Sequence, residues 1–397
     1  MNKNILTSKI QDYLSENLRA DLITILLKPL NYEGVTNKEI AEQIEAKNKC
    51  KDKLPTWFGT PNIYYPNKLN IEQTSSEVTA QFKAGLVSGK SILDMTGGFG
   101  VDSYFFSHRM EEVYHCEMNN DLSEIAKYNF KILGRTNIHT IATDGIAFLK
   151  NSEVTLDWVY IDPSRRHDAK GKVFLLSDCL PNVPDNLSLI LGKVKKVMIK
   201  TSPLLDISAG LKELDFVKEI YIIAVKNEVK EVLWILEQSY QNEVLIKTVN
   251  LSGSEIERFN FKNDEEKLAH SDFSHPQEFL YEPNSAILKS GAFKTIGNAF
   301  NLYKLHEHSH LYTNSQLLEF PGRTFKIAKT IPFNKKEIQK LNLSKANITV
   351  RNFPMSVAEI RKKSKIKDGG ELYLFFTTNP KGEKIIIECY KIAVKLN

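Results

Sequence analysis

Apolar positions in the first fifty residues recur at helical spacing. Ile5, Ile10 and Leu14 can lie on one face of a helix, and Ile40 and Ile44 follow a Thr36-x-x-Glu39 capping box. This pattern predicts a small helical module at the N-terminus.

The pattern is interrupted over residues 51–72, where three prolines, Pro55, Pro61 and Pro66, break the periodicity. We expect an extended connector there. A second capping box, Thr74-Ser-Ser-Glu77, then predicts a helix that ends near Gly85 to Gly89.

From Lys90 onward, short β-rich runs alternate with helical stretches. Such alternation is typical of βαβ units, in which a mostly parallel sheet is covered by helices. We therefore predict a doubly wound, Rossmann-like α/β domain with seven strands, followed by a polar linker over residues 252–274. The expected strands are Ser91–Met95, Glu112–Cys116, Ile138–Ala142, Leu156–Ile161, Lys195–Thr201, Glu219–Val225 and Glu243–Val249.

The remainder of the chain has a mixed α+β pattern. Residues 280–316 combine both periodicities, and residues 317–397 predict a compact unit. In this unit we expect strands over 347–353, 371–378 and 384–390, and a basic helix over 356–366. Asn379-Pro-Lys-Gly382 predicts the turn between the last two strands.

Charge is distributed unevenly along the chain. The net charge is +5, but residues 321–397 hold 17 Lys and Arg against 6 Asp and Glu, a local charge of +11. A basic block of this kind suits a polyanion such as RNA, although a solvated, solubilising face gives the same pattern.

Composition excludes several other classes of protein. No stretch approaches the ~20 apolar residues of a membrane helix, and the N-terminus has no secretory signal, so we expect a cytoplasmic protein without membrane contact. Cys50, Cys116, Cys179 and Cys389 have no CxxC spacing, which argues against a zinc ribbon or a disulfide scaffold.

Candidate chemistry begins at a glycine-rich turn after the first expected strand, Asp94-Met-Thr96-Gly97-Gly98-Phe99-Gly100. Such a turn brings the backbone close to a ligand. A dinucleotide enzyme uses GxGxxG to hold a pyrophosphate, but here Ser103 replaces the third glycine and Asp94 would repel phosphate. A carboxylate instead suits S-adenosylmethionine (AdoMet), which carries an ammonium and a sulfonium, so the turn predicts an AdoMet site.

Three more acidic residues follow expected strands. Glu117 stands where a carboxylate can accept the ribose hydroxyls, Asp144 can accept the adenine amino group, and Asp162 lies at the edge where doubly wound sheets bind ligands. Each also has a structural interpretation: Asp94 as a helix cap, Glu117 as a surface acid, Asp144 as a turn former and Asp162-Pro163 as a strand terminator. Their common register with the glycine turn favours the cofactor site.

The chain resembles the bacterial class I AdoMet-dependent methyltransferases that carry a C-terminal THUMP-like domain and, more distantly, trimethylguanosine synthase. The resemblance implies four parts: a helical module and connector over 1–72, a methyltransferase domain over 73–252, a small ferredoxin-like domain over 275–320 and a basic THUMP-like domain over 321–397. The motifs that carry it are Glu72–Lys83, Leu93–Asp102, Ile161–Arg166, Lys200–Asp206, Arg351–Met355 and Ile366–Gly370.

The acceptor side departs from a familiar pattern. Related amino methyltransferases use an Asp/Asn-Pro-Pro-aromatic loop to bind and stack a base, whereas this chain has Asp162-Pro163-Ser164 followed by Arg165 and Arg166. We expect Asp162, Pro163 and Ser164 to face the acceptor, and base amine methylation is in doubt. The two arginines could bind phosphate or pair with a neighbouring acid, and Lys200 is expected to face the cleft.

Two further clusters have open interpretations. His306-Glu-His308-Ser-His310 could place three imidazoles on one face of a strand as a metal site, but a solvated histidine-rich edge is favoured and we predict no metal. Arg351, Arg361, Lys362 and Lys363 are expected to contact an RNA backbone.

These patterns together predict an AdoMet-dependent RNA methyltransferase. The alternatives are a non-catalytic RNA-binding protein that keeps the AdoMet fold, and a protein or small-molecule methyltransferase.

Overall fold

The computed structural model describes residues 1–165, 175–334, 341 and 343–392. The chain divides into two compact units, Met1–Val217 with Trp234–Tyr240 and Lys218–Leu233 with Gln241–Asn397. No helix in the described residues is both long and apolar enough to cross a membrane.

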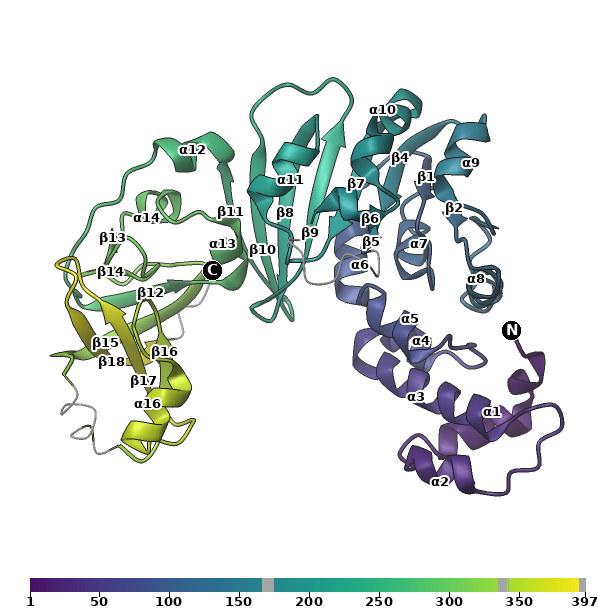
Figure 1. Ribbon diagram of the computed structural model, residues 1–397, viewed down its shortest axis with the longest axis horizontal. Helices are drawn as coiled ribbons and strands as arrows, with labels where there is room; N and C mark the ends of the chain where they lie inside the picture. The colour runs from purple at the N-terminus through teal and green to yellow at the C-terminus, as the bar shows by residue number, and fades with distance from the viewer. Residues whose placement is uncertain (166–174, 335–340, 342, 393–397) are drawn as a thin grey trace. The chain divides into compact units, whose positions relative to one another are not determined.

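The chain is an α/β protein with one large mixed sheet (Figure 1). Nine strands are hydrogen-bonded in the order β11-β10-β8-β9-β7-β4-β1-β2-β3, and β3, β2, β1, β4 and β7 pair parallel with one another. Their bounds are β1 Ser91–Asp94, β2 Glu112–Cys116, β3 Ile138–Ile141, β4 Leu156–Ile161, β7 Val194–Thr201, β8 Val217–Val225, β9 Glu228–Glu237, β10 Leu245–Ser252 and β11 Glu255–Lys262.

All seven predicted strands are present, but the expected count of seven is too low. β9 follows β8 through Lys226 and Asn227, which both have positive φ, as two-residue hairpin turns require. β11 pairs antiparallel with β10 inside the segment that we expected to be a linker. Its side chains are mostly solvated, so its composition is that of a loop although its backbone is a strand.

Helices in the first unit pack on the strands and on one another. α6 packs against α7, and α10 packs against β7 and α9. Two short strands, β5 (Ser164–Arg165) and β6 (Cys179–Leu180), pair antiparallel beside the sheet. The helices are α6 Glu77–Ala84, α7 Val101–Phe106, α8 Asn120–Ile132, α9 Gly145–Asn151, α10 Val183–Lys193 and α11 Ile207–Glu213, with a 3-10 turn at Leu176–Asp178.

The N-terminal helices form the predicted module, and the Thr36–Glu39 capping box is confirmed at the start of α3. The prediction of an extended connector over residues 51–72 is wrong, because α4 and α5 form in this segment. The second capping residue is Ser76, whose side chain accepts from the Thr79 amide, and not Thr74. The elements are a 3-10 turn at Lys3–Leu6, α1 Ser8–Glu16, α2 Leu22–Leu27, α3 Asn37–Lys53, α4 Pro55–Gly59 and α5 Lys68–Gln73.

This module shares one hydrophobic core with the α/β part of the first unit. Trp57 packs edge-on against Tyr104 of α7, with ring centroids 4.8 Å apart. Buried Asn129 of α8 binds the Tyr64 backbone twice, accepting from its amide (3.0 Å) and donating to its carbonyl (2.8 Å). The N-terminal helices are therefore an integral layer of the first unit.

The second unit contains a second sheet, of seven strands, in the order β13-β14-β12-β15-β18-β17-β16. The expected C-terminal strands and basic helix are confirmed within a few residues of their predicted bounds. The elements are α12 Asn263–Leu268, β12 Phe279–Pro283, α13 Ser285–Ser290, α14 Thr295–Ala299, β13 Tyr303–Lys304, β14 Tyr312–Asn314, β15 Gly322–Pro332, β16 Asn347–Val350, α16 Val357–Ser364, β17 Leu372–Thr378 and β18 Lys384–Ile392.

All four cysteines are buried free thiols. Burial raises the pKa of Cys50, Cys116 and Cys389 to about 12.

We expect Asn129→Ala to lower the free energy of unfolding of the first unit by about 2 to 4 kcal/mol, because it leaves the buried amide and carbonyl of Tyr64 without partners. Urea denaturation followed by tryptophan fluorescence measures this, since Trp57, Trp158 and Trp234 all lie in that unit. Exposed Asn151→Ala is the control. An equal loss of unfolding free energy in both variants would show that the hydrogen bonds between Asn129 and Tyr64 do not stabilise the first unit.

Candidate functional site

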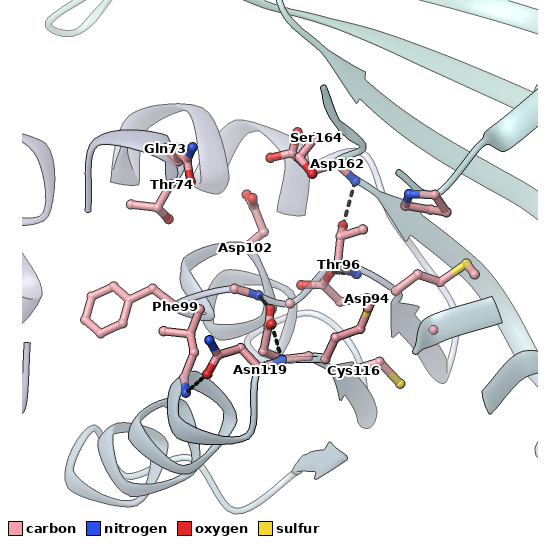
Figure 2. Close-up of a pocket in the computed structure, with 18 of the residues that line it drawn as sticks. Gln73, Thr74, Asp94, Thr96, Phe99, Asp102, Cys116, Asn119, Asp162 and Ser164 are labelled. Carbon is pink, nitrogen blue, oxygen red and sulfur yellow. Dashed lines mark hydrogen bonds between the residues drawn. The ribbon is translucent and has the colours of Figure 1, made fainter. Parts of the chain in front are cut away.

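A cavity of about 660 Å³ opens at the carboxyl ends of the parallel strands in the first unit. It brings together most of the residues that the sequence predicted, from the ends of β1, β2, β3, β4 and β7, and Figure 2 shows part of this wall. They are Asp94, Thr96, Gly97, Gly98, Phe99, Glu117, Asp144, Asp162, Ser164 and Lys200. Gly100 and Pro163 are not among the described residues that line it.

The glycine turn is held against the end of β2. The Gly97 amide donates to the Cys116 carbonyl (2.7 Å), and the Gly98 amide donates to Glu117 Oε2 (2.9 Å). A Cβ on Gly97 would lie 2.3 Å from His115 Nε2, and one on Gly100 would lie 2.3 Å from the Phe130 ring. Packing against these side chains therefore requires glycine at positions 97 and 100. At Gly98 the backbone φ is +55°, a conformation that favours glycine.

Asp94 is buried at the bottom of the turn, with 1% of its surface exposed. Its carboxylate accepts hydrogen bonds from the Thr96 amide (3.1 Å) and the Ser103 hydroxyl (2.7 Å). It does not cap α7, whose N-cap residue is Gly100. Burial raises the pKa of Asp94 from 3.8 to about 7. A buried carboxylate of this kind gains from a cation beside it.

Glu117 and Asp144 line the cavity while each holds a local backbone segment. Glu117 accepts from the amides of Gly98 and Asn119 (2.9 and 2.7 Å). Asp144 is the N-cap residue of α9 and accepts from the Ala147 amide (2.8 Å). A carboxylate has about four lone-pair sites, so these bonds leave capacity for a ligand.

Asp162 is connected to the glycine turn and to the strand beside its own. Its amide donates to Thr96 Oγ1 (2.7 Å), as Figure 2 shows, and its carboxylate Oδ2 lies 2.5 Å from Lys200 Nζ. The side chains of Asp162 and Lys200 are 29% and 14% exposed. An acidic and a basic group thus stand together in the cavity wall.

The structure adds cavity residues that our site predictions missed. Asp102 of α7 lines the cavity, where its carboxylate accepts from Ser75 Oγ (2.8 Å) and Tyr160 Oη (3.0 Å) and pairs with fully buried Lys83 (3.0 Å). Ser75 and Asp102 both lie in motifs that carry the family resemblance, Glu72–Lys83 and Leu93–Asp102, but we assigned neither of them a role in the site. The other missed lining residues include Asn70, Gln73, Thr74, Ser75 and Asn119.

Of the remaining residues predicted near the turn and the acceptor, the structure describes Phe99 and Arg165. Phe99 is 3% exposed and packs near Trp57, with its ring directed away from Asp94 (Figure 2). Arg165 lies on β5, and Arg166 falls outside the described residues.

Two of the predicted RNA-contacting residues have partners within the second unit. Arg351 binds buried Glu282 (2.9 Å), and Arg361 binds Asp368 and the carbonyls of Ala346 and Ile366. Lys362 and Lys363, by contrast, are exposed near the end of α16.

The histidine cluster does not lie on a strand. His306 to His310 fall between β13 and β14, where the His310 ring stacks on Phe293 with centroids 3.7 Å apart. Among the described residues there is no group of three or more His, Cys, Asp or Glu side chains that could hold a metal.

We expect Asp94→Asn to stabilise the protein above pH 7. The folded state keeps the Asp94 proton up to about pH 7, whereas the unfolded chain releases it near 3.8, so rising pH favours unfolding between these values. Asp94→Asn has no such proton to release, so its free energy of unfolding at pH 8 should exceed that of the wild type by about 2 to 4 kcal/mol. Urea denaturation at pH 5 and 8 measures the difference, with exposed Asp52→Asn as control. The same pH dependence in both variants would exclude Asp94 as its source.

Comparisons with known proteins place these features in a family. A ferredoxin-like domain model matches residues 279–321, and a THUMP domain-like model matches residues 322–391. Two uncharacterized RNA methyltransferases, from Mycoplasma mobile and Clostridium acetobutylicum, are each 26% identical over 167 and 184 residues, or 38% and 41% of this chain. The matches cover 44% and 38% of those proteins, so the chain spans less than half the length of these relatives.

A solved structure is similar over almost its whole length. The crystal structure of a methyltransferase-like protein from Porphyromonas gingivalis W83 is 30% identical, with a TM-score of 0.88, over 98% of this chain and 99% of that chain. The chain therefore belongs to the family of methyltransferase-like proteins that carry ferredoxin-like and THUMP-like C-terminal domains.

Proposed function

We propose that this protein is an AdoMet-dependent methyltransferase that acts on RNA. The observation that carries the proposal is the cavity in which Asp94, Glu117, Asp144 and Asp162 surround a glycine turn at the carboxyl ends of parallel strands. That edge is where doubly wound sheets bind nucleotide-like ligands.

The chemistry of the cavity fits AdoMet. Its sulfonium supplies a methyl group that is open to displacement by a nucleophile. Asp94, buried with a raised pKa, would be stabilised in its ionised form by the positive charges of the cofactor. Glu117 and Asp144 supply acceptors for ribose hydroxyls and an adenine amino group, and pyrophosphate would be repelled by the same carboxylates.

Three observations support RNA as the substrate. The relatives from Mycoplasma mobile and Clostridium acetobutylicum are described as RNA methyltransferases. The C-terminal segment matches a THUMP domain-like model, and residues 321–397 carry a local charge of +11. Exposed Lys362 and Lys363 can release counterions from phosphates on binding.

The wild-type protein should bind AdoMet and its demethylated product in the micromolar range, and Asp94→Ala should weaken binding about 10- to 100-fold because a cation loses its carboxylate. Affinity should fall about tenfold from pH 8 to pH 6 as Asp94 takes up a proton, and Asp94→Ala should lose this dependence.

Isothermal calorimetry measures both effects, with Asp52→Ala as the control. Absence of binding heat for the wild type with either ligand would overturn the cofactor assignment. Binding without methyl transfer to RNA would favour the non-catalytic alternative.

RNA binding should depend on the lysines of α16. We expect Lys362→Ala with Lys363→Ala to reduce the slope of log affinity against log salt by about 1.4, since each phosphate contact on a single strand contributes about 0.7. Fluorescence anisotropy of a labelled single-stranded RNA across a salt series measures the slope. Lys51→Ala with Lys131→Ala, exposed lysines of the first unit, is the matched control. Identical slopes for wild type and both double variants would exclude α16 from the interface.

A further inference from the structure

We propose that the group methylated is a hydroxyl, the ribose 2′-OH of RNA, and that Lys200 and Asp162 together bind it. This inference rests on the proposed function and names its acceptor atom. Its starting point is the 2.5 Å ion pair between Lys200 Nζ and Asp162 Oδ2 in the cavity wall.

The pair is fixed to the turn assigned to the cofactor. Thr96, within that turn, accepts from the Asp162 amide, and Asp94 accepts from the Thr96 amide. Lys200 is the penultimate residue of the neighbouring parallel strand β7, which pairs with β4 in register up to Ile199 and Ile161. Both side chains retain exposure, so a group that enters the cavity can reach them.

Donor and acceptor chemistry distinguishes the possible nucleophiles. A hydroxyl has one donor and two acceptor sites, so it can donate to the Asp162 carboxylate while it accepts from the Lys200 ammonium. An exocyclic base amine presents two N–H donors and needs two acceptors. The ammonium of Lys200 has only donors and would oppose that amine.

The described wall also differs from that of a base-stacking site. Phe99 is the only aromatic residue among the described residues that line the cavity, and it packs near Trp57. Ser164 stands two residues after Asp162, where it lines the cavity as an exposed polar side chain. These residues suit the sugar edge of a nucleotide better than the face of a base.

A second ion pair, between Lys83 and Asp102, lies close to the pair of Lys200 and Asp162. Burial raises the pKa of Asp102, but Lys83 and Lys200 more than offset this, so the Asp102 pKa lies below its ordinary value. The charges of Asp102 and Lys200 therefore attract each other. Lys200 can therefore supply positive charge beside the attacking oxygen.

The reaction balances without any further reactant. The hydroxyl oxygen forms a bond to the methyl carbon as the carbon–sulfur bond breaks, and sulfur leaves as a neutral thioether. The hydroxyl proton passes to the Asp162 carboxylate and from there to water, while the Lys200 ammonium stabilises charge that develops on the oxygen.

The site of the methyl group tests the inference. Total bacterial RNA is incubated with the protein and tritiated AdoMet, then hydrolysed with alkali, which cannot cleave a phosphodiester next to a 2′-O-methyl group. We expect tritium in alkali-resistant dinucleotides. Tritium in mononucleotides would overturn the hydroxyl assignment and leave the proposed function standing, whereas no tritium in any RNA fraction would overturn both.

Variants test the two side chains. Lys200→Met and Asp162→Asn should each lower the transfer rate about 100-fold or more, as loss of a charge-stabilising or proton-accepting group does. Their affinity for demethylated AdoMet should stay within about threefold of the wild type, which shows that the cavity is folded. Lys195→Met, an exposed position on the same strand, is the control. Transfer at the wild-type rate by Lys200→Met would overturn the role of Lys200.

Discussion

The first unit depends on burying carboxylates at the end of a parallel sheet. Asp94 and Asp102 are both buried, but their partners differ. Asp102 pairs with Lys83, whereas the partners of Asp94 among the described residues are two hydrogen-bond donors, and burial raises the pKa of Asp94. Placing an unpaired acid in a low-dielectric site costs stability. This cost is explained if a positively charged ligand completes the site.

Much of this arrangement was predictable because strand ends and glycine turns have local signatures. Asp94, Glu117, Asp144 and Asp162 each follow a run of β-branched and aromatic residues, and parallel strands bring such ends to one edge. The seven predicted strands and the basic C-terminal helix are all present. The roles of the individual site residues, and the domain boundaries, remain predictions.

Other features depend on contacts between residues far apart in sequence, which spacing does not reveal. Arg351 binds Glu282, 69 residues earlier, and its basic character alone does not reveal this ion pair. β11 has polar composition because most of its side chains are solvated, and α4 forms in the proline-rich connector because Pro55 occupies its first turn, where proline is tolerated. Asp102 and Lys83 become a pair only when α6 packs on α7.

The buried cysteines make the two units separately observable. A thiol reacts as its thiolate, and here burial keeps Cys50, Cys116 and Cys389 protonated and covered. Alkylating reagents and oxidants therefore reach them only when the surrounding structure opens. The first unit contains Cys50, Cys116 and Cys179, and the second contains Cys389. The labelling rate at each sulfur therefore reports local unfolding within one unit.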